Sequence, residues 1–228
     1  MVDAVPTFHP EPEALLAYAA GGLDESNSVL VATHLALCPD CRAEVRRLET
    51  VGGALTETIE PVALAPDALA ATLARLDEPE ASPQSALTAP PAAPDFDRET
   101  LLSVPAPLRD YLGGNLSALP WRWRGPSIRE LPLPIGDGGP RASLIRVRPG
   151  TALPAHTHTG AETTLVLCGA FVDDGNRFAR GDVAVAGSDD DHKPVATPDA
   201  ECLCFAVIDG PLQLTGPIGR LFNPFLKL

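Results

Sequence analysis

The chain has 228 residues, of which 45% are hydrophobic and 21% charged, and its formal net charge is −13. This apolar content excludes a wholly disordered protein, and the negative charge argues against direct nucleic-acid binding, which uses a basic surface. No apolar run reaches the length needed to cross a bilayer, and the first residues lack the basic and apolar regions of a signal peptide. We therefore expect a cytoplasmic protein that binds neither DNA nor a membrane.

The N-terminal third, residues 1–77, is predicted to be a small helical domain. Asp24 is a good N-cap residue, Gly21 and Gly22 stop a preceding helix, and Pro39 suits the first turn of a following one. A helical unit this small often needs a metal or a partner to be stable. The first two expected helices cover residues 13–20 and 24 to about 37. A third helix is expected from residue 39, with the apolar stripe Leu48, Val51 and Leu55. A fourth is expected from residue 66, with Leu69, Leu73 and Leu76 as its apolar residues.

Charge is distributed unevenly along the chain. Residues 1–77 contain 12 acidic and four basic residues, whereas residues 99–228 contain 14 acidic and 12 basic residues. An acidic N-terminal surface suits a basic partner, such as a DNA-binding protein. A solvated acidic surface that only keeps the protein soluble is the alternative interpretation.

Residues 78–98 are rich in proline and alanine and show no apolar period, so we predict an extended linker. Residues 99–228 then change character, because short β-rich runs alternate with Gly, Pro, Asn and Asp. Many short strands separated by turn residues predict an all-β sandwich or barrel. The expected fold class is therefore a multidomain α+β protein, with a helical bundle followed by an all-β domain.

The strongest local motif is HLALCPDC at residues 34–41. His34 and Cys38 are four residues apart and lie on one helical face, and Cys41 follows across the Pro39 turn. Three nitrogen and sulfur ligands of this kind favour tetrahedral zinc, and His9 is the natural fourth ligand. A redox-active CxxC pair or two buried thiols are the alternatives, although a redox pair normally follows a strand in a βαβ unit.

The stretch LLAYAAGGLDESNSVLVATHLALCPDCRAEV, with its upstream histidine, resembles the ChrR-type zinc-binding anti-sigma factors. The resemblance implies a small helical bundle that binds an extracytoplasmic-function (ECF) sigma factor and blocks its access to RNA polymerase. An acidic domain is electrostatically suited to a basic sigma factor.

A second set of ligand-type residues lies in the β-rich half. His156, His158 and Glu162 are separated by even numbers of residues, so an extended chain directs them to one face, although Thr159-Gly160 interrupts the pattern. Two histidines and a carboxylate bind divalent metals such as Zn, Fe, Mn or Ni. His192 is placed to complete the set from a facing strand.

This second motif resembles the first cupin motif, and ChrR-type anti-sigma factors carry such a C-terminal domain. The resemblance implies a small jelly-roll barrel over residues 99–228 with His156, His158, Glu162 and His192 as ligands. The second cupin motif departs from the usual pattern, because Gly187-Ser-Asp-Asp-Asp replaces the usual Pro-x-Gly and Ala196 stands where Asn is usual. Because of this departure, the sequence does not predict the conformation of the loop before His192.

The five cysteines are an odd number and predict no disulfide framework. Cys168, Cys202 and Cys204 are expected to be buried apolar residues, with Cys202 and Cys204 on one face of a strand.

Together with the resemblance, these patterns predict a regulator and not an enzyme. The resemblance implies that the N-terminal domain, with structural zinc, inhibits an ECF sigma factor. It also implies that the cupin, with zinc or alternatively Fe, Mn or Ni, senses an oxidative signal such as singlet oxygen and triggers release. The alternative is a cupin dioxygenase or isomerase in which the helical domain is an accessory.

Overall fold

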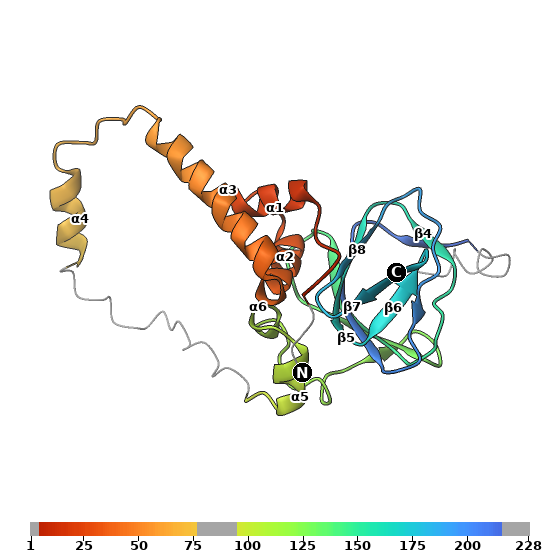
Figure 1. Cartoon of the computed structure of the whole chain (residues 1–228). Helices are drawn as coiled ribbons and strands as arrows, with labels where there is room; N and C mark the ends of the chain where they lie inside the picture. The colour runs from red at the N-terminus through yellow and green to blue at the C-terminus, as the bar shows by residue number, and fades with distance from the viewer. Residues whose placement is uncertain (1–4, 77–94, 216–228) are drawn as a thin grey trace.

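The structure, a computed structural model, describes residues 5–76 and 95–215. A group of helices lies beside a β-barrel, and one long helix projects away from both (Figure 1). Most of the predicted linker lies outside the described residues, but its last residues do not. Asp97 is the N-cap of a short helix and accepts a hydrogen bond from the backbone N–H of Thr100.

All four predicted helices are confirmed. They are α1 (Pro12–Ala19), α2 (Glu25–Leu37), α3 (Pro39–Glu57) and α4 (Ala68–Leu76). Asp24 caps α2 as expected, because its side chain accepts a hydrogen bond from the backbone N–H of Asn27 at 3.0 Å. No helix in the described part of the chain is long and apolar enough to cross a membrane.

Two further helices, α5 (Arg98–Ser103) and α6 (Ala106–Arg109), were not predicted. The β-rich part therefore begins later than the predicted boundary at residue 99, because α5 and α6 come first and the first strand begins at Arg122. These helices are too short to show a helical period in the sequence, and tertiary contacts hold them. The hydroxyl of Thr100, for example, is buried and accepts a hydrogen bond from the backbone N–H of Leu116.

The rest of the chain forms the predicted all-β domain. Its larger sheet has six antiparallel strands in the order β1-β2-β3-β10-β5-β8. These strands are β1 (Arg122–Trp123), β2 (Ile128–Pro132), β3 (Arg141–Val147), β10 (Cys202–Ile208), β5 (Glu162–Cys168) and β8 (Val183–Ala186). The central strands β10 and β5 are dominated by buried apolar residues, as expected for a sheet that is covered on both faces.

The opposite wall of the barrel consists of two smaller sheets. One has the order β7-β6-β9 and the other pairs β11 with β4. An isolated bridge between His156 and His192 joins the end of β4 to the segment before β9. The strands are β4 (His156–His158), β6 (Ala170–Asp173), β7 (Asn176–Ala179), β9 (Val195–Ala196) and β11 (Leu212–Leu214).

Helix α2 shares a hydrophobic core with the barrel. Val29 and Leu30 of α2 belong to the same buried cluster as Leu108 of α6 and Leu144 and Phe205 of the large sheet. The side chain of Leu30 is 1% exposed. The helical region and the barrel are therefore joined by apolar packing as well as by the polypeptide.

Replacing Leu30 with alanine is expected to lower the free energy of unfolding by about 2–5 kcal/mol, because it leaves a cavity in this shared core. Leu69→Ala is the matched control, since Leu69 is 72% exposed on α4 and should change stability by less than about 0.5 kcal/mol. Chemical denaturation measures both. An equally small effect at Leu30 would contradict a shared core.

Candidate metal centres

The junction between α2 and α3 positions three of the predicted ligands. Pro39 cannot continue α2, because it lacks an N–H and restricts the residue before it to an extended conformation. Cys38 accordingly has φ −110° and ψ 107°, ends α2 and caps α3. His34 lies one turn before this break and Cys41 one turn after it, so all three side chains converge.

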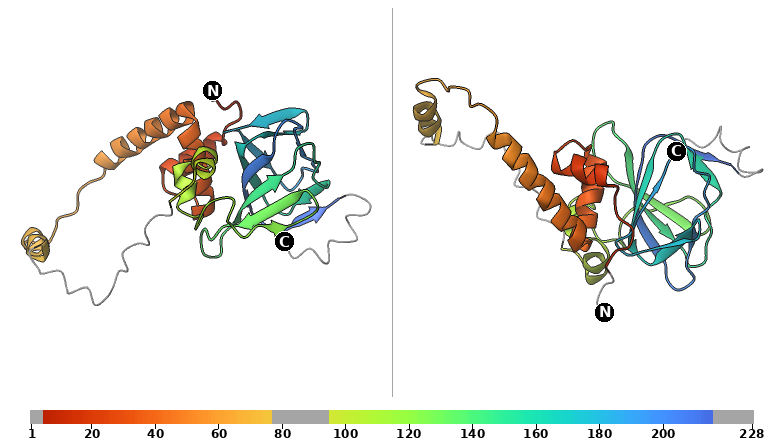
Figure 2. Two further views of the ribbon diagram at one scale, coloured as in Figure 1. Left: turned by 90° about the horizontal axis from the view of Figure 1, so that it is seen from below. Right: turned by 45° about the horizontal axis from the view of Figure 1, so that its top comes forward.

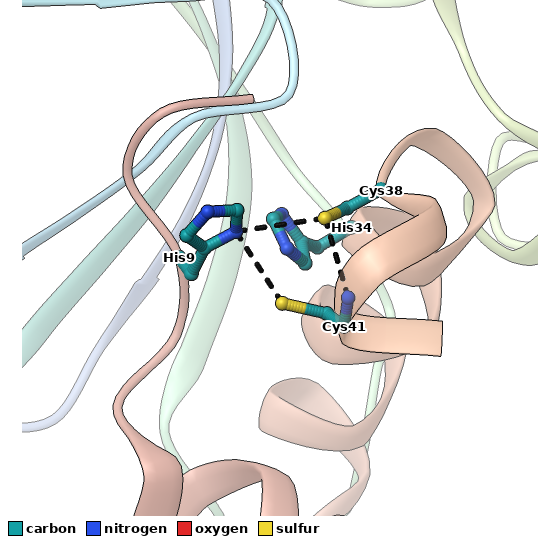
Figure 3. Close-up of side chains that lie close together, drawn as sticks. All are labelled: His9, His34, Cys38 and Cys41. Atoms are coloured by element: carbon teal, nitrogen blue, oxygen red, sulfur yellow. Dashed lines mark hydrogen bonds between the residues drawn. The ribbon is translucent and has the colours of Figure 1, made fainter. Parts of the chain in front are cut away.

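His9 completes the group from an extended N-terminal arm that runs beside the junction, with its ring directed toward the two cysteines (Figure 3). Its Nδ1 lies 3.5 Å from Sγ of Cys38 and 3.3 Å from Sγ of Cys41. The four ligand atoms of His9, His34, Cys38 and Cys41 all lie within 4.8 Å of one another. The structure thus brings together the whole set that the sequence singled out.

This donor set fits a zinc ion. His34 is fully buried, and its Nδ1 donates to the carbonyl oxygen of Gly181 at 2.8 Å. Its Nε2 is also buried and has no hydrogen-bond partner among the described residues, so it is the nitrogen left for a metal. Two imidazoles and two thiols form a standard zinc ligand set.

The electrostatics of the buried ligands also favour a cation. Burial lowers the pKa of His34, which keeps the imidazole neutral and able to coordinate. Burial, together with the neighbouring Cys38, raises the pKa of Cys41 to about 12. A thiolate at this position therefore needs a nearby positive charge, which a divalent metal supplies.

The second group lies at one end of the barrel cavity. His156 and His158 are both buried on β4, with the less buried Thr157 between them. Glu162 begins β5, after the interruption at Thr159-Gly160, so the three residues come from two strands and not from one. His192 faces them through reciprocal backbone hydrogen bonds with His156 of 3.0 and 3.1 Å.

The side chains of this group are in close contact. The carboxylate of Glu162 lies 2.6 Å from Nε2 of His158 and 3.9 Å from Nε2 of His156. Nε2 of His158 is 3.3 Å from Nε2 of His192. As in the first group, the four ligand atoms lie within 4.8 Å of one another.

Two of these imidazoles are oriented by a hydrogen bond from the other ring nitrogen. Nδ1 of His156 contacts the carbonyl oxygen of Pro154 at 2.8 Å, and Nδ1 of His192 contacts the carboxylate of Asp173 at 2.6 Å. Such partners fix the tautomer and leave Nε2 for a metal. Asp173 was not predicted, because it is 19 residues from His192 and belongs to no ligand motif.

The charge state of Glu162 suits a cation as well. Burial alone would raise its pKa, but the neighbouring imidazoles of His156 and His158 hold the pKa well below the usual range. Glu162 is therefore a partly buried, ionised carboxylate, the form that binds a divalent ion. His158 adds a buried Nδ1 that has no partner within the described ranges.

The loop before His192 departs from the cupin pattern and is held locally. The carboxylate of Asp190 accepts a hydrogen bond from the backbone N–H of Gly187 at 2.7 Å, and Asp191 accepts one from the hydroxyl of Thr215 at 2.6 Å. These acidic residues thus shape the loop that presents His192 and are not among the clustered ligands.

A cavity of about 200 Å³ extends from His192 and Glu162 into the barrel. Its wall includes the rings of Phe171 and Phe178 and the thiols of Cys202 and Cys204. The two cysteines are buried on one face of β10, as predicted, with their Sγ atoms 3.5 Å apart. The second group of ligands therefore borders a partly open and largely apolar cavity.

Comparison with known proteins identifies both halves. The ChrR cupin-like domain family matches residues 112–213, and a zinc-finger family matches residues 13–42. The zinc-finger match contains His34, Cys38 and Cys41 but begins after His9. These matches confirm the predicted fold class, a helical zinc-finger region followed by a cupin-like barrel.

A protein sequence and a chain from a crystal structure, both named ChrR, match nearly the whole chain. The anti-sigma-E factor ChrR of Cereibacter sphaeroides is 41% identical over 220 residues, which cover 96% of this chain and 98% of that protein. A chain from the crystal structure of Rhodobacter sphaeroides SigE in complex with the anti-sigma ChrR is 40% identical, with a TM-score of 0.74 over 90% of this chain and 100% of that chain.

Cobalt binding tests the first centre. Co²⁺ bound at His9, His34, Cys38 and Cys41 is expected to give a thiolate-to-metal charge-transfer absorption, because two of its four ligands are sulfur. Cys38→Ser should weaken or abolish this band, whereas Cys168→Ser, outside both groups, should leave it unchanged. A band that is unaffected by Cys38→Ser would contradict the assignment.

Asp173→Asn tests the second centre. Loss of the carboxylate partner of His192 is expected to lower metal affinity about 10–100-fold, as measured by competition with a chelator and by metal content. Asp174→Asn is the matched control, because the neighbouring Asp174 is exposed and asparagine tolerates its positive φ of 44°. Equal affinities for the two variants would exclude a role for Asp173.

Proposed function

Because this chain belongs to the ChrR family of anti-sigma factors, we propose that it binds an ECF-type RNA polymerase sigma factor and inhibits it. The relatives named above support this proposal, since one is called an anti-sigma-E factor and the other is from a complex of SigE with an anti-sigma factor. The similarity extends over both halves of the chain, so it includes the helical region that would hold the sigma factor.

The observation that carries the proposal is an exposed apolar surface on the projecting helices. Helix α3 extends well beyond the body of the protein, and α4 lies still farther out (Figure 2). Large apolar side chains that are at least half exposed follow this path: Val51, Leu55, Ile59, Val62, Leu64, Leu69, Leu73 and Leu76. Helix α4 buries none of its residues.

Such a surface is unfavourable in water. A short segment that exposes so many large apolar residues is unusual in a monomeric soluble protein, and exposed apolar surface of this kind marks interaction sites. An amphipathic helix such as α4, with Leu69, Leu73 and Leu76 at spacings of four and three, is suited to a hydrophobic groove of a partner. We therefore place the sigma factor on the second half of α3 and on α4, away from the barrel.

Charge supports a basic, DNA-binding partner. Residues 1–77 contain 12 acidic and four basic residues, so the docking surface is set in an acidic domain. Complementary charge accelerates association with a basic partner and disfavours acidic ones. By binding the sigma factor, this domain would compete with RNA polymerase for it and would need no direct contact with DNA.

In this proposal the metal at His9, His34, Cys38 and Cys41 is structural zinc. The apolar cluster around it is small, with Leu15, Val31, Leu35 and Val45 as its buried members apart from the two cysteines. A zinc ion would contribute folding free energy that so small a cluster lacks. Zinc would therefore keep α3 in the orientation that presents the docking surface.

The barrel is the sensing half of the proposal. A divalent metal held by His156, His158, Glu162 and His192 would act as a Lewis acid next to the cavity. We propose zinc, with Fe, Mn and Ni as alternatives, and an oxidative signal such as singlet oxygen. The signal would alter the ligands or the cavity contents and so weaken the hold on the sigma factor.

An enzymatic role is the second candidate, and the cavity beside the second centre is the observation that favours it. Cupin metalloenzymes bind small substrates next to such ligand sets. Stoichiometric iron with oxygen consumption on a small dicarbonyl or phenolic substrate would support this role. Two zinc ions per chain and no turnover would support the regulator.

The sigma-binding surface is tested by introducing a charge on α4. Leu73→Asp is expected to weaken binding to the ECF sigma factor at least about 30-fold, because it places a charge at the centre of an apolar interface. Binding is measured by calorimetry, and inhibition by transcription in vitro from a promoter that depends on this sigma factor.

Ala71→Asp is the matched control, since it introduces the same residue into the same helix on the face opposite Leu69 and Leu73. It should bind within about threefold of the wild type, as substitutions outside an interface generally do. Failure of the wild-type chain to bind any ECF sigma factor of its own genome would overturn the proposed function.

A further inference from the structure

The turn between β7 and β8, residues 180–182, touches the first centre and directly follows a strand whose Phe178 lines the barrel cavity. The carbonyl oxygen of Gly181 accepts the hydrogen bond from Nδ1 of His34. This contact joins residues 147 positions apart in the sequence. The barrel therefore supplies the partner that orients a predicted zinc ligand of the helical domain.

The same turn holds the arm that carries His9. Asp182 is buried, and its Oδ1 accepts hydrogen bonds from the backbone N–H groups of Thr7 at 2.6 Å and Phe8 at 3.0 Å. The backbone N–H of Val183 donates to the carbonyl oxygen of Phe8 at 3.0 Å. Both polar groups of the Phe8 backbone, next to His9, are thus bound by the barrel.

Close packing adds to these hydrogen bonds. Gly181 has φ +90°, and a Cβ at this position would lie 2.6 Å from Cγ of Pro6 and 3.5 Å from Cβ of Leu37. Only glycine allows the turn to come this close to the arm and to the end of α2. Gly181 therefore serves both the positive φ of this turn and the close approach of the arm.

Phe178, just before the turn, connects this contact to the cavity. Its ring packs on the ring of Phe8 with centroids 4.5 Å apart and stacks on Phe171 with centroids 5.1 Å apart. Phe178 and Phe171 both line the cavity beside His192. The residue before His9 is therefore in direct contact with a wall of the barrel cavity.

We propose that Gly181 and Asp182 are positioning residues of the N-terminal zinc site, so that its affinity for metal depends on the docked barrel. Gly181 orients His34, and Asp182 holds the arm so that His9 faces the two cysteines. This inference deepens the proposed function, because it gives the barrel a physical route to the domain that holds the sigma factor.

Two glycines provide a matched pair for the test. Gly181→Ala should displace Pro6 and the arm, whereas Gly175→Ala introduces the same residue at a similar φ of +78° with no atom within 4 Å. The probe is Co²⁺ added to the full-length chain. The thiolate charge-transfer band reports the first centre alone, because the second group has no sulfur ligand.

Competition between the protein and a chelator then gives the Co²⁺ affinity of the first centre. Gly181→Ala is expected to lower this affinity about 10–100-fold, as loss of the groups that orient metal ligands does, and Gly175→Ala should lower it less than about threefold. Equal affinities for the two glycine variants would overturn the inference.

Asp182→Ala and Asp182→Asn give a graded test that does not introduce a steric clash. The alanine variant removes the carboxylate acceptor for the N–H groups of Thr7 and Phe8, while asparagine retains one oxygen and should restore some of the affinity. Metal bound at the second centre is measured in the same samples, to show that the barrel remains folded. If Asp182→Ala binds Co²⁺ as tightly as the wild type while the barrel retains its metal, the inference is wrong.

The wild-type spectrum separates this inference from the function on which it rests. Absence of a thiolate band in the wild type would contradict the zinc assignment itself. A normal band with equal affinities in all variants would contradict only the positioning role. Sigma binding is not a readout in these measurements, so its failure would not affect their outcome.

Discussion

A single buried imidazole, that of His34, contacts three regions of this molecule: the helical region, the N-terminal arm and the barrel. Its ring lies at the end of α2, faces the arm that carries His9, and donates from Nδ1 to a barrel carbonyl. The remaining nitrogen, Nε2, is buried without a hydrogen-bond partner in the described part of the chain. A buried polar atom without a partner costs free energy, and a bound metal would remove that cost. His34 thus contributes to the orientation of α2, α3 and the arm relative to the barrel, together with the apolar packing of Val29 and Leu30.

The same arrangement gives the helical region a buried surface and an exposed one. Helix α2 is buried against the barrel through Val29 and Leu30, whereas α4 and the second half of α3 are exposed. A change in the barrel therefore meets the helical region on the side opposite the proposed sigma-binding surface. Helix α3 is joined to the docked helix α2 at Cys38, so the zinc junction lies between the barrel and the proposed sigma-binding surface. This geometry makes the junction the natural point of control in the proposed regulator.

The sequence predicted the features that local geometry determines. Helical spacing placed His34 and Cys38 on one face, and Pro39 marked the break that adds Cys41. The resemblance to the cupin motif indicated His156, His158 and Glu162. His192 was predicted because it is a ligand-type residue at a suitable distance along the chain. Features that depend on tertiary contact were missed. Asp173 and Asp182 belong to no motif, and the short helices α5 and α6 are held by contacts such as that of Thr100 with Leu116. The docking of α2 on the barrel was not predicted either, because a buried helix face does not reveal which surface covers it.

Hydrogen exchange of the full-length chain, alone and with its ECF sigma factor, tests the central claim most directly. Backbone amides of the exposed half of α3 and of α4 should exchange rapidly in the free protein and slow markedly in the complex, because their apolar face becomes buried. Amides of α2 and of the large sheet should be protected in both states. Sigma inhibition with no protection of residues 51–76 would contradict the claim that these helices hold the sigma factor.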